Sequence, residues 1–308
     1  MVGVNQEYIR ELEKHFQAKA VIIDISCISE IQKRVIDVSD TEYLNNTQKY
    51  LTKHFYEFSK PDLAYDVQSV LLFAFPFPAR ALAGFTIEGK LKTFPVCLEN
   101  RAQYEIVSKE LNGLLGQKGY HAQFMPKLPR KLIAVSSGLA KYGRNNIAYV
   151  DGLGSFVSFL PFYTDIPTDN HILYPAERMS FCNKCSRCVT LCPTQAIRPN
   201  FDIIDSERCL TYFNEKDSNE VTFPDWVNPK VHNSVIGCEV CQINCPQNKA
   251  FLANEKLVAV FDETETELLC KGTTYENLSG PIKEKVDALN IGYLLSALPR
   301  NLKLLLSK

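Results

Sequence analysis

Eleven cysteines occur in this chain, and eight of them fall between Cys182 and Cys245. The first four have the spacing C-x2-C-x2-C-x3-C and precede a proline: they are Cys182, Cys185, Cys188 and Cys192, followed by Pro193. Two-residue gaps let three thiolates of one tight loop reach three corners of a [4Fe–4S] cluster. The fourth cysteine lies beyond a turn, and in bacterial ferredoxins it binds a second cluster.

A second set of cysteines completes the pattern. Cys209 stands alone, and a C-x2-C-x3-C run before Pro246 adds Cys238, Cys241 and Cys245. The ferredoxin crossover assigns one cluster to Cys182, Cys185, Cys188 and Cys245. It assigns the other cluster to Cys192, Cys209, Cys238 and Cys241.

Zinc is the alternative metal for these cysteines. Zinc sites usually pair two separate C-x2-C knuckles, whereas three cysteines here follow one another at two-residue gaps before a Cys-Pro. The spacing therefore favours two iron–sulfur clusters over zinc. We expect the other three cysteines to be ordinary buried small residues: they are Cys27, Cys97 and Cys270.

Composition indicates a soluble globular protein. The 308 residues are 45% hydrophobic and 22% charged, and the formal net charge of -1 is unlike that of a basic nucleic-acid binder. The longest uncharged apolar runs, 67–79 and 152–164, are shorter than the roughly 18 residues of a membrane helix. The first twenty residues carry charges of both signs, unlike a signal peptide, and no twin-arginine pair occurs. We expect a cytoplasmic protein without a membrane partner, where clustered cysteines bind metal rather than form disulfides.

The elements that position the cysteines are mixed. Apolar, β-branched runs predict strands over 20–25, 68–74, 147–150 and 156–160, with a hairpin turn at Gly152-x-Gly154. Helical spacing predicts one helix ending near Gly116 and a second from about Pro129 to just before Gly138. A short terminal helix is expected to open at Pro299-Arg300-Asn301 and to include the leucine-rich residues 302–306. Strands mixed with helices indicate a layered α/β (α+β) domain before the cysteines.

The region before the cysteines carries no familiar nucleotide motif. Ser155 follows Gly152-x-Gly154 without a third glycine, so a dinucleotide fingerprint is missing. The five histidines are dispersed and have no ligand spacing. Two clusters in series would form a short electron path, and about 180 residues precede it. We therefore expect this part of the chain to hold the acceptor of those electrons.

Several motifs resemble those of the epoxyqueuosine reductases. They are the stretch 137–146, which includes Tyr142-Gly143-Arg144-Asn145, then Gly154-Ser155-Phe156 and the segment 163–167. The cysteine motifs also match, including Arg208-Cys209-Leu210-Thr211-Tyr212 and the run from Gly237 to Asn248. The resemblance covers more than half of the chain, and reductive dehalogenases share the same architecture.

This resemblance implies a fold, cofactors and domains. It implies a nitroreductase-like domain over 1–175 that binds base-off cobalamin, a bacterial ferredoxin-like double-cluster module over 176–250, and a helical tail over 251–308 packed on the core. Cobalt chemistry of this kind needs a very low potential, which [4Fe–4S] clusters reach. The corrinoid-binding residues that it implies are Gly138, Tyr142, Gly143, Arg144, Asn145, Ser155, Tyr163 and Tyr212.

The sequence departs from the family at one catalytic segment. Family members carry an aspartate, a proton donor, just before the helix leading to the glycine block, whereas 124–131 here contains no acid. Tyr104 is the candidate proton donor, with a plain helix-face residue as the alternative. Lys127 and Arg130 are candidates for orienting an anionic substrate or a corrinoid amide, with a solvated loop as the alternative.

We therefore expect a cobalamin-dependent iron–sulfur reductase, a divergent paralogue of the epoxyqueuosine enzymes. Its expected substrate is small or nucleoside-like, and its expected donor is ferredoxin or flavodoxin. Many relatives bind tRNA with further helical repeats, for which the short segment after Cys245 leaves little room. The alternatives are an electron carrier or activator for a separate corrinoid protein, a dehalogenase-like enzyme, and a redox sensor.

Overall fold

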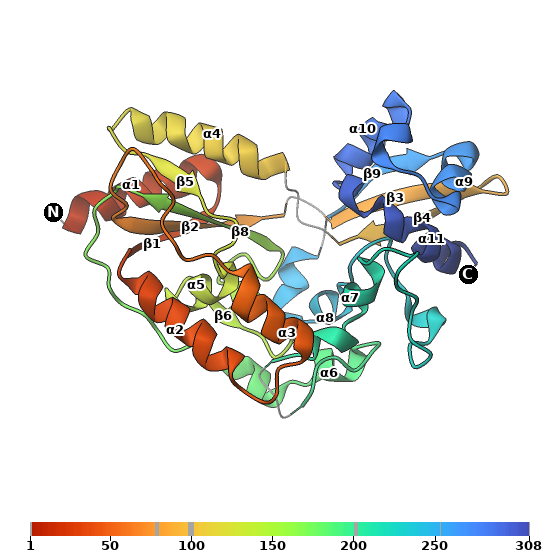
Figure 1. The fold of residues 1–308 in the computed structure, drawn as a ribbon, viewed down its shortest axis with the longest axis horizontal. Helices are drawn as coiled ribbons and strands as arrows, with labels where there is room; N and C mark the ends of the chain where they lie inside the picture. The colour runs from red at the N-terminus through yellow and green to blue at the C-terminus, as the bar shows by residue number, and fades with distance from the viewer. Residues whose placement is uncertain (1, 78–79, 98–101, 200–202, 253, 308) are drawn as a thin grey trace. The chain divides into compact units, whose positions relative to one another are not determined.

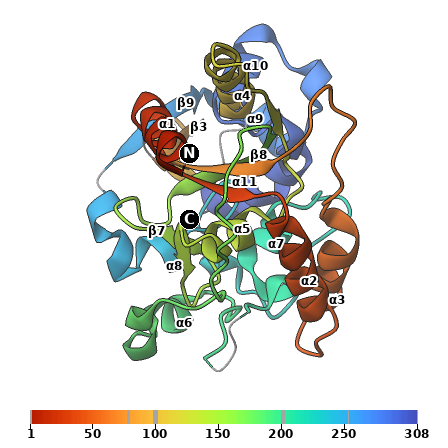
Figure 2. The ribbon, with the colours of Figure 1, turned by 90° about the vertical axis from the view of Figure 1, so that its left-hand side faces the viewer.

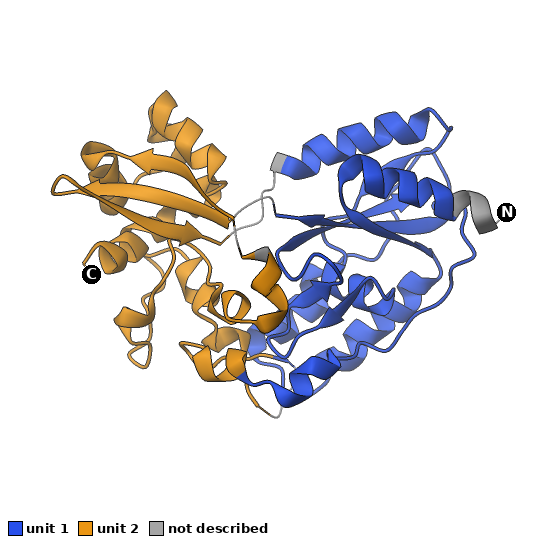
Figure 3. Cartoon of the chain, turned by 180° about the vertical axis from the view of Figure 1, so that it is seen from behind, with its two compact units in different colours: residues 1–77, 102–186, 200–203 blue, residues 78–101, 187–199, 204–308 orange. Residues whose placement is uncertain are grey.

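The computed structural model describes residues 2–77, 80–97, 102–199, 203–252 and 254–307. The chain forms two compact units that alternate along the sequence (Figures 1 and 3). Unit 1 contains residues 1–77, 102–186 and 200–203. Unit 2 contains residues 78–101, 187–199 and 204–308. The units therefore follow spatial packing and not the order of the sequence.

Unit 1 is built on an antiparallel sheet of four strands in the order β1-β2-β8-β5. They are β1 (Lys19–Asp24), β2 (Ser69–Pro76), β8 (Val157–Thr164) and β5 (Ala122–Phe124). The two central strands are buried almost throughout, as expected for continuous apolar runs covered on both faces. Side chains alternate along β2, so that Leu71 and Phe73 face one core while Val70 and Leu72 face the other.

Helices cover both faces of this sheet (Figures 1 and 2). On one face, α1 (Val2–Phe16) and α4 (Ala102–Gly116) bury Leu12 and Leu111. On the other face, α2 (Cys27–Ser39) and α5 (Arg130–Ser136) bury Ile31 and Ile133. The connection between α2 and β2 adds α3 (Asn46–Tyr50) and a π-helical turn, η1 (Leu51–Phe55). Helices on both faces of a sheet agree with the layered α/β (α+β) class expected from the sequence.

A small ribbon lies beside α5, and it corrects one expectation. β6 (Ala140–Tyr142) pairs with β7 (Ala148–Val150), whereas β8 pairs with β2 and β5. The Gly152-x-Gly154 segment does turn tightly, because Val150 and Gly154 exchange both backbone hydrogen bonds at 2.8 and 2.9 Å. The chain then enters the main sheet. The expected hairpin between 147–150 and 156–160 is therefore wrong, since long-range pairing of β8 prevails over the local turn.

Unit 2 contains a three-stranded sheet in the order β4-β3-β9. β3 (Arg80–Ile87) and β4 (Lys90–Val96) form a hairpin, and β9 (Glu255–Phe261) pairs in parallel with β3. One face packs on helices that follow β9; these are α9 (Glu263–Lys271), α10 (Gly280–Ala288), η7 (Gly292–Ala297) and α11 (Leu298–Leu306). A short η6 (Tyr275–Asn277) lies between α9 and α10. The tail expected to be helical thus begins with a strand.

The eight clustered cysteines lie on or next to short helical elements between β8 and β9. η2 (Ser180–Lys184) belongs to unit 1. The other elements belong to unit 2: α6 (Arg187–Leu191), η3 (Ser206–Arg208), α7 (Leu210–Asn214), η4 (Pro229–Val231), α8 (Val240–Ile243) and η5 (Pro246–Phe251). Such short turns suit a segment whose shape is set by its ligands, since little apolar surface holds it.

The local elements expected from the sequence are largely confirmed. The strands at β1, β2, β7 and β8 and the helices α4, α5 and α11 all form, with ends shifted by a few residues. The three consecutive domains expected from the sequence stay a prediction. The two units group the segments differently, because β9 completes the sheet begun by β3. Within the described part of the chain, no helix combines the length and apolar character needed to cross a membrane.

Candidate metal centre

The first two cysteines of the motif, Cys182 and Cys185, lie on a short segment whose backbone is hydrogen-bonded by Arg144. Arg144 donates from Nη2 to the carbonyl oxygen of Cys182 at 2.6 Å and from Nε to that of Cys185 at 3.2 Å. The preceding segment is also tied to unit 1, because the amide of Met179 donates to the carbonyl of Tyr142 at 2.8 Å. The C-x2-C loop is therefore held in place by the turn that follows β6.

This turn, residues 143–146, is shaped by residues that the sequence singled out. A Cβ on Gly143 would lie 2.5 Å from Oδ1 of Asn145 and 2.6 Å from the Tyr149 ring, so a larger residue does not fit. The buried Asn145 side chain donates to the hydroxyl of Tyr149 at 3.0 Å. The turn closes with Asn146 in the left-handed region at φ 60°. Gly143 and Asn145 thus fix the backbone that carries Arg144.

Three cysteines of the other set lie together in unit 2. Burial raises the pKa of Cys238 to about 11, and the nearby Cys209 and Cys192 thiols contribute to that rise. Burial also raises the pKa of Cys209, with Cys192 again contributing. Thiolates gathered in this way oppose one another's ionisation, and a bound cationic metal relieves that cost. Helix α6, which carries Cys188, also packs against α8, which carries Cys241.

Hydrogen-bond donors are already directed at these sulfurs. The amide of Ala196 donates to Sγ of Cys192 at 3.2 Å, and Nδ2 of Asn233 donates to Sγ of Cys238 at 3.5 Å. Backbone and hydroxyl donors of Thr211 lower the pKa of Cys209 against the larger effect of burial. Donors to thiolate sulfur are the usual surroundings of iron–sulfur ligands, where they tune the potential.

The backbone before Cys238 is packed unusually tightly. Gly237 has φ 75°, and a Cβ there would lie 2.6 Å from the carbonyl oxygen of Cys97. The Asn214 side chain bonds Gly237 on both sides, accepting from its amide at 3.0 Å and donating to its carbonyl. Asn301 in turn donates to the carbonyls of Asn214 and Val235 at 2.7 and 2.9 Å. No pattern in the sequence indicated this support, for which the only local signal is a glycine directly before a cysteine.

The charged side chains next to Cys238 form an ion pair. Arg80 donates from Nε to Glu239 at 2.7 Å, and both side chains are 11% exposed. The ion pair joins β3 to the residue between Cys238 and Val240, and Glu255 on β9 binds the same arginine. Because the pair is largely shielded from water, removing one partner would leave an uncompensated charge.

The donor chemistry of these cysteines fits iron–sulfur clusters. Among the described residues, no three His, Cys, Asp or Glu side chains lie closely enough to hold one metal ion. Grouped thiols, backbone donors to sulfur and the clamped C-x2-C loop are the features that such a cluster uses.

A group of phenols and one guanidinium lies in unit 1, around the N-terminal end of α5. Arg130 donates to the hydroxyl of Tyr104 at 3.3 Å and to the carbonyl of Phe159 at 3.2 Å. Burial raises the pKa of Tyr56, against an opposing effect of Arg130, and burial with help from Tyr56 raises that of Tyr142. The structure therefore places Arg130 beside Tyr104 and adds Tyr56, which no sequence pattern indicated and which lies near both Arg130 and Tyr142.

Lys127 lies apart from this group, on the surface. Its ammonium pairs with Glu57, and both side chains are about half exposed. The amide of Glu57 also donates to the carbonyl of Lys127 at 3.2 Å. The segment 124–131 has no acid of its own, but Glu57 brings a carboxylate to it from a distant part of the sequence.

The remaining residues proposed for the corrinoid are spread over three environments. Gly138 has φ 81°, with the exposed Tyr174 ring 2.9 Å from the position of a Cβ. Ser155 is buried, and Tyr163 is fully buried with its hydroxyl donating to the carbonyl of Phe58 at 3.0 Å. Tyr212 belongs to unit 2, where the Lys216 ammonium lies 3.9 Å from its ring centroid.

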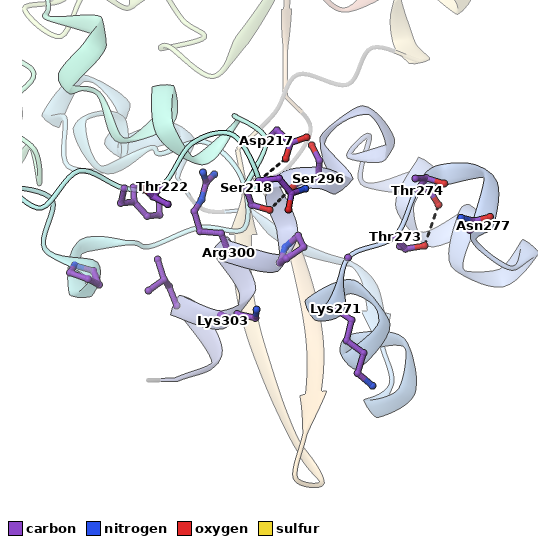
Figure 4. Close-up of a pocket in the computed structure, with 16 residues that line it drawn as sticks. Asp217, Ser218, Thr222, Lys271, Thr273, Thr274, Asn277, Ser296, Arg300 and Lys303 are labelled. Carbon is purple, nitrogen blue, oxygen red and sulfur yellow. Dashed lines mark hydrogen bonds between the residues drawn. The ribbon is translucent and has the colours of Figure 1, made fainter.

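A cavity of about 1000 Å³ opens in unit 2 between the 217–223 loop, the 271–277 segment and α11 (Figure 4). Ser218 fastens the loop by donating to the carbonyl of Ser296. Arg300 points into the region, but its guanidinium donates to the carbonyls of Phe213, Lys216 and Val221. Arg300 therefore anchors the chain that follows Cys209 and is not directed at a ligand.

Residues 181–248 match the family model described as a 4Fe-4S double cluster binding domain. The epoxyqueuosine reductase of Cyclobacterium marinum is 31% identical over 167 residues, which are 54% of this chain and 47% of that protein. The epoxyqueuosine reductase of Cellulophaga algicola is 28% identical over 225 residues, 67% of each chain. The chain thus spans about half the length of the first of these relatives.

The fold is similar to those of solved epoxyqueuosine reductases. The epoxyqueuosine reductase of Bacillus subtilis is 20% identical, with a TM-score of 0.66 over all of this chain and 82% of that one. A selenomethionine-labelled epoxyqueuosine reductase is 19% identical, with a TM-score of 0.67 and the same coverage. At these identities the likeness concerns the fold.

Proposed function

We propose that this chain, which is similar in sequence and fold to epoxyqueuosine reductases, is an iron–sulfur reductase with two [4Fe–4S] clusters. The observation that carries the proposal is the pair of cysteine sets. Arg144 binds the carbonyls of two cysteines of the first set, and three cysteines of the second set are grouped in unit 2, with donors at two of their sulfurs. The proposed ligands of the first cluster are Cys182, Cys185, Cys188 and Cys245. Those of the second cluster are Cys192, Cys209, Cys238 and Cys241.

We propose that the acceptor of the electrons is a corrinoid bound by unit 1. Phenol hydroxyls and a guanidinium are suitable donors for the amide carbonyls at the edge of a corrin, and Tyr56, Tyr104, Arg130 and Tyr142 supply them. When bound, a corrinoid supplies a strongly reducing cobalt centre, and the clusters supply single electrons at low potential. Gly138 and the turn that carries Arg144 complete the proposed binding region.

The phenols have a second role in this proposal, which is to hold protons. Tyr56 and Tyr142 are protonated at neutral pH, as tyrosines ordinarily are. Burial raises the pKa of both, which makes them weaker acids than an exposed tyrosine. Tyr104 is polarised by the Arg130 guanidinium on its hydroxyl oxygen. A reduction that consumes protons together with electrons needs such donors next to the reacting group. The proposed substrate is an epoxyqueuosine-like nucleoside, free or in RNA, with ferredoxin or flavodoxin as the electron donor.

The test uses the full chain purified without air. We expect about eight irons per chain from two clusters, retention of added cobalamin after desalting, and loss of the epoxide from an epoxyqueuosine-containing RNA stem-loop when a low-potential donor is supplied. Iron content well below this value, or zinc in its place, would reject the proposal. Eight irons without retained cobalamin would make the chain an electron carrier, and retained cobalamin without turnover would reject the substrate.

A further inference from the structure

The guanidinium of Arg144 contacts two residues that carry proposed cluster ligands. Its Nη2 lies 2.6 Å from the carbonyl oxygen of Cys182, and its Nε lies 3.2 Å from that of Cys185. The Cys185 amide also faces the Cys182 carbonyl, at 3.4 Å. One planar fork therefore spans the two-residue gap between the cysteines, and lysine, with a single ammonium, lacks that geometry.

The base of this side chain is rigid. Gly143 packs directly against the Tyr149 ring, and the buried Asn145 side chain donates a hydrogen bond to the hydroxyl of the same tyrosine. On the other side, the Lys131 ammonium donates to the carbonyl of Asn146 at 3.3 Å. The turn is thus held from both ends, so the guanidinium is preorganised and loses little freedom when it binds the cysteine loop.

A fixed positive charge beside a cluster has a defined electrical effect. A [4Fe–4S] cluster with four thiolates becomes more negative when it accepts an electron, and net charge and hydrogen bonding set its potential. Arginine keeps its charge at every pH that a protein tolerates. Because Arg144 is partly buried, its attraction for the added electron is screened less than that of a surface charge. The charge therefore stabilises the reduced cluster.

We propose that Arg144 is a positioning residue that fixes the Cys182–Cys185 loop and raises the reduction potential of the first cluster. The inference rests on the proposed function, because it requires that the clusters form. The role concerns the cluster, although the sequence motif had placed Arg144 among the corrinoid-binding residues. The positive charge of Arg144 acts on the reduction potential, and its planar fork holds the cysteine loop. Arg144→Gln removes both the charge and the fork, whereas Arg144→Lys removes only the fork.

The experiment compares Arg144→Gln and Arg144→Lys with the wild-type chain after anaerobic reconstitution. Reduction is followed by electron paramagnetic resonance at controlled potentials, and the first cluster is recognised in a Cys209→Ala chain that lacks a ligand of the second. We expect Arg144→Gln to lower the ratio of reduced to oxidised first cluster about tenfold at a given potential, which is 59 mV for one electron. The second cluster should be unchanged. Arg144→Lys should shift the potential less but lose iron to a chelator faster than wild type.

Arg34→Gln is the matched control. Arg34 also belongs to unit 1 and donates to a backbone carbonyl, that of Tyr174 at 2.7 Å, but to no cysteine. Wild-type potentials and iron retention in both Arg144 variants, or an equal shift in Arg34→Gln, would overturn the inference. If Arg144→Gln fails to keep the first cluster, the positioning role is tested with Arg144→Lys alone. Iron release from Arg144→Lys at the wild-type rate would then refute that role. A wild-type chain without two clusters would instead reject the proposed function itself.

Discussion

Gly237 lies so close to Cys97 that a Cβ on the glycine would be 2.6 Å from the Cys97 carbonyl oxygen and 2.7 Å from its Cβ. The contact joins the end of β4 to the residue directly before Cys238, and the amide of Cys97 continues it by donating to the carbonyl of Ile236 at 3.0 Å. The position of one proposed cluster ligand therefore depends on a strand far from it in sequence.

Gly237→Ala should destabilise unit 2 by about 3 kcal/mol, because it adds a backbone clash to the cost of φ 75° for a non-glycine residue. Denaturant unfolding and iron content measure the effect. Gly89→Ala is the matched control, since Gly89 has φ 69° in the same unit and no atom within 4 Å of its Cβ position. It should cost about 1 kcal/mol, the backbone term alone. Equal losses in both variants would mean that the contact with Cys97 contributes nothing.

Replacing either Cys209 or Cys238 by serine should remove one cluster and leave about four irons per chain, because both belong to the same proposed set. Iron and sulfide assays on anaerobically reconstituted protein measure this. Cys270→Ser serves as the control and should keep about eight irons. Loss of all iron in the Cys209 and Cys238 variants would contradict two separate clusters.

Asn301→Ala should lower the free energy of unfolding by about 3 kcal/mol. Asn301 is fully buried, and its loss leaves the carbonyls of Asn214 and Val235 without their donor. Lys303→Ala, an exposed change on the same helix, should alter stability by less than about 0.5 kcal/mol. Denaturant unfolding distinguishes the two, and similar values for both would show that the Asn301 bonds are not needed.

The stability of unit 1 should fall above pH 10. Burial raises the pKa of Tyr163 to about 12, while the unfolded chain ionises near 10. The unfolded state therefore releases its proton first, and stability is lost as the pH rises from 10 to 12. At pH 11 the loss is about 1.4 kcal/mol for this group.

Tyr163→Phe tests this dependence. It should cost about 1 kcal/mol at pH 8, through the lost bond to the Phe58 carbonyl, but decline less between pH 9 and 11 than wild type. Tyr50→Phe, at a tyrosine that is 64% exposed, should follow the wild-type curve. Parallel curves for Tyr163→Phe and wild type would show that Tyr163 does not carry the effect.

The sequence was sufficient for features set by neighbouring residues. The cysteine spacing is local, and so are the apolar runs of β2 and β8 and the helical period of α4. It was insufficient wherever distant segments meet. Nothing near Arg144 indicates that its guanidinium binds the carbonyls of Cys182 and Cys185, and nothing near Tyr56 indicates Arg130 as a neighbour.

Pairing between distant segments also explains where the fold departs from the expectation. The turn at Gly152 and Gly154 is a good local signal for a hairpin, yet β8 gains more by pairing along its whole length with β2 than with the three-residue β7. β9 lies in the segment that was expected to be a helical tail, because its partner β3 lies on the far side of the cysteines and no local pattern announces their pairing.

That parallel pairing of β3 with β9 also has a consequence for synthesis of the chain. A ribosome releases β3 early, then every one of the eight clustered cysteines, and only afterwards β9 and the helices that cover the sheet. Since units fold as they emerge, unit 2 stays open while its thiols leave the exit tunnel and closes only when nearly the whole chain is made. The cysteines of unit 2 therefore leave the ribosome before β9 can complete the sheet of that unit.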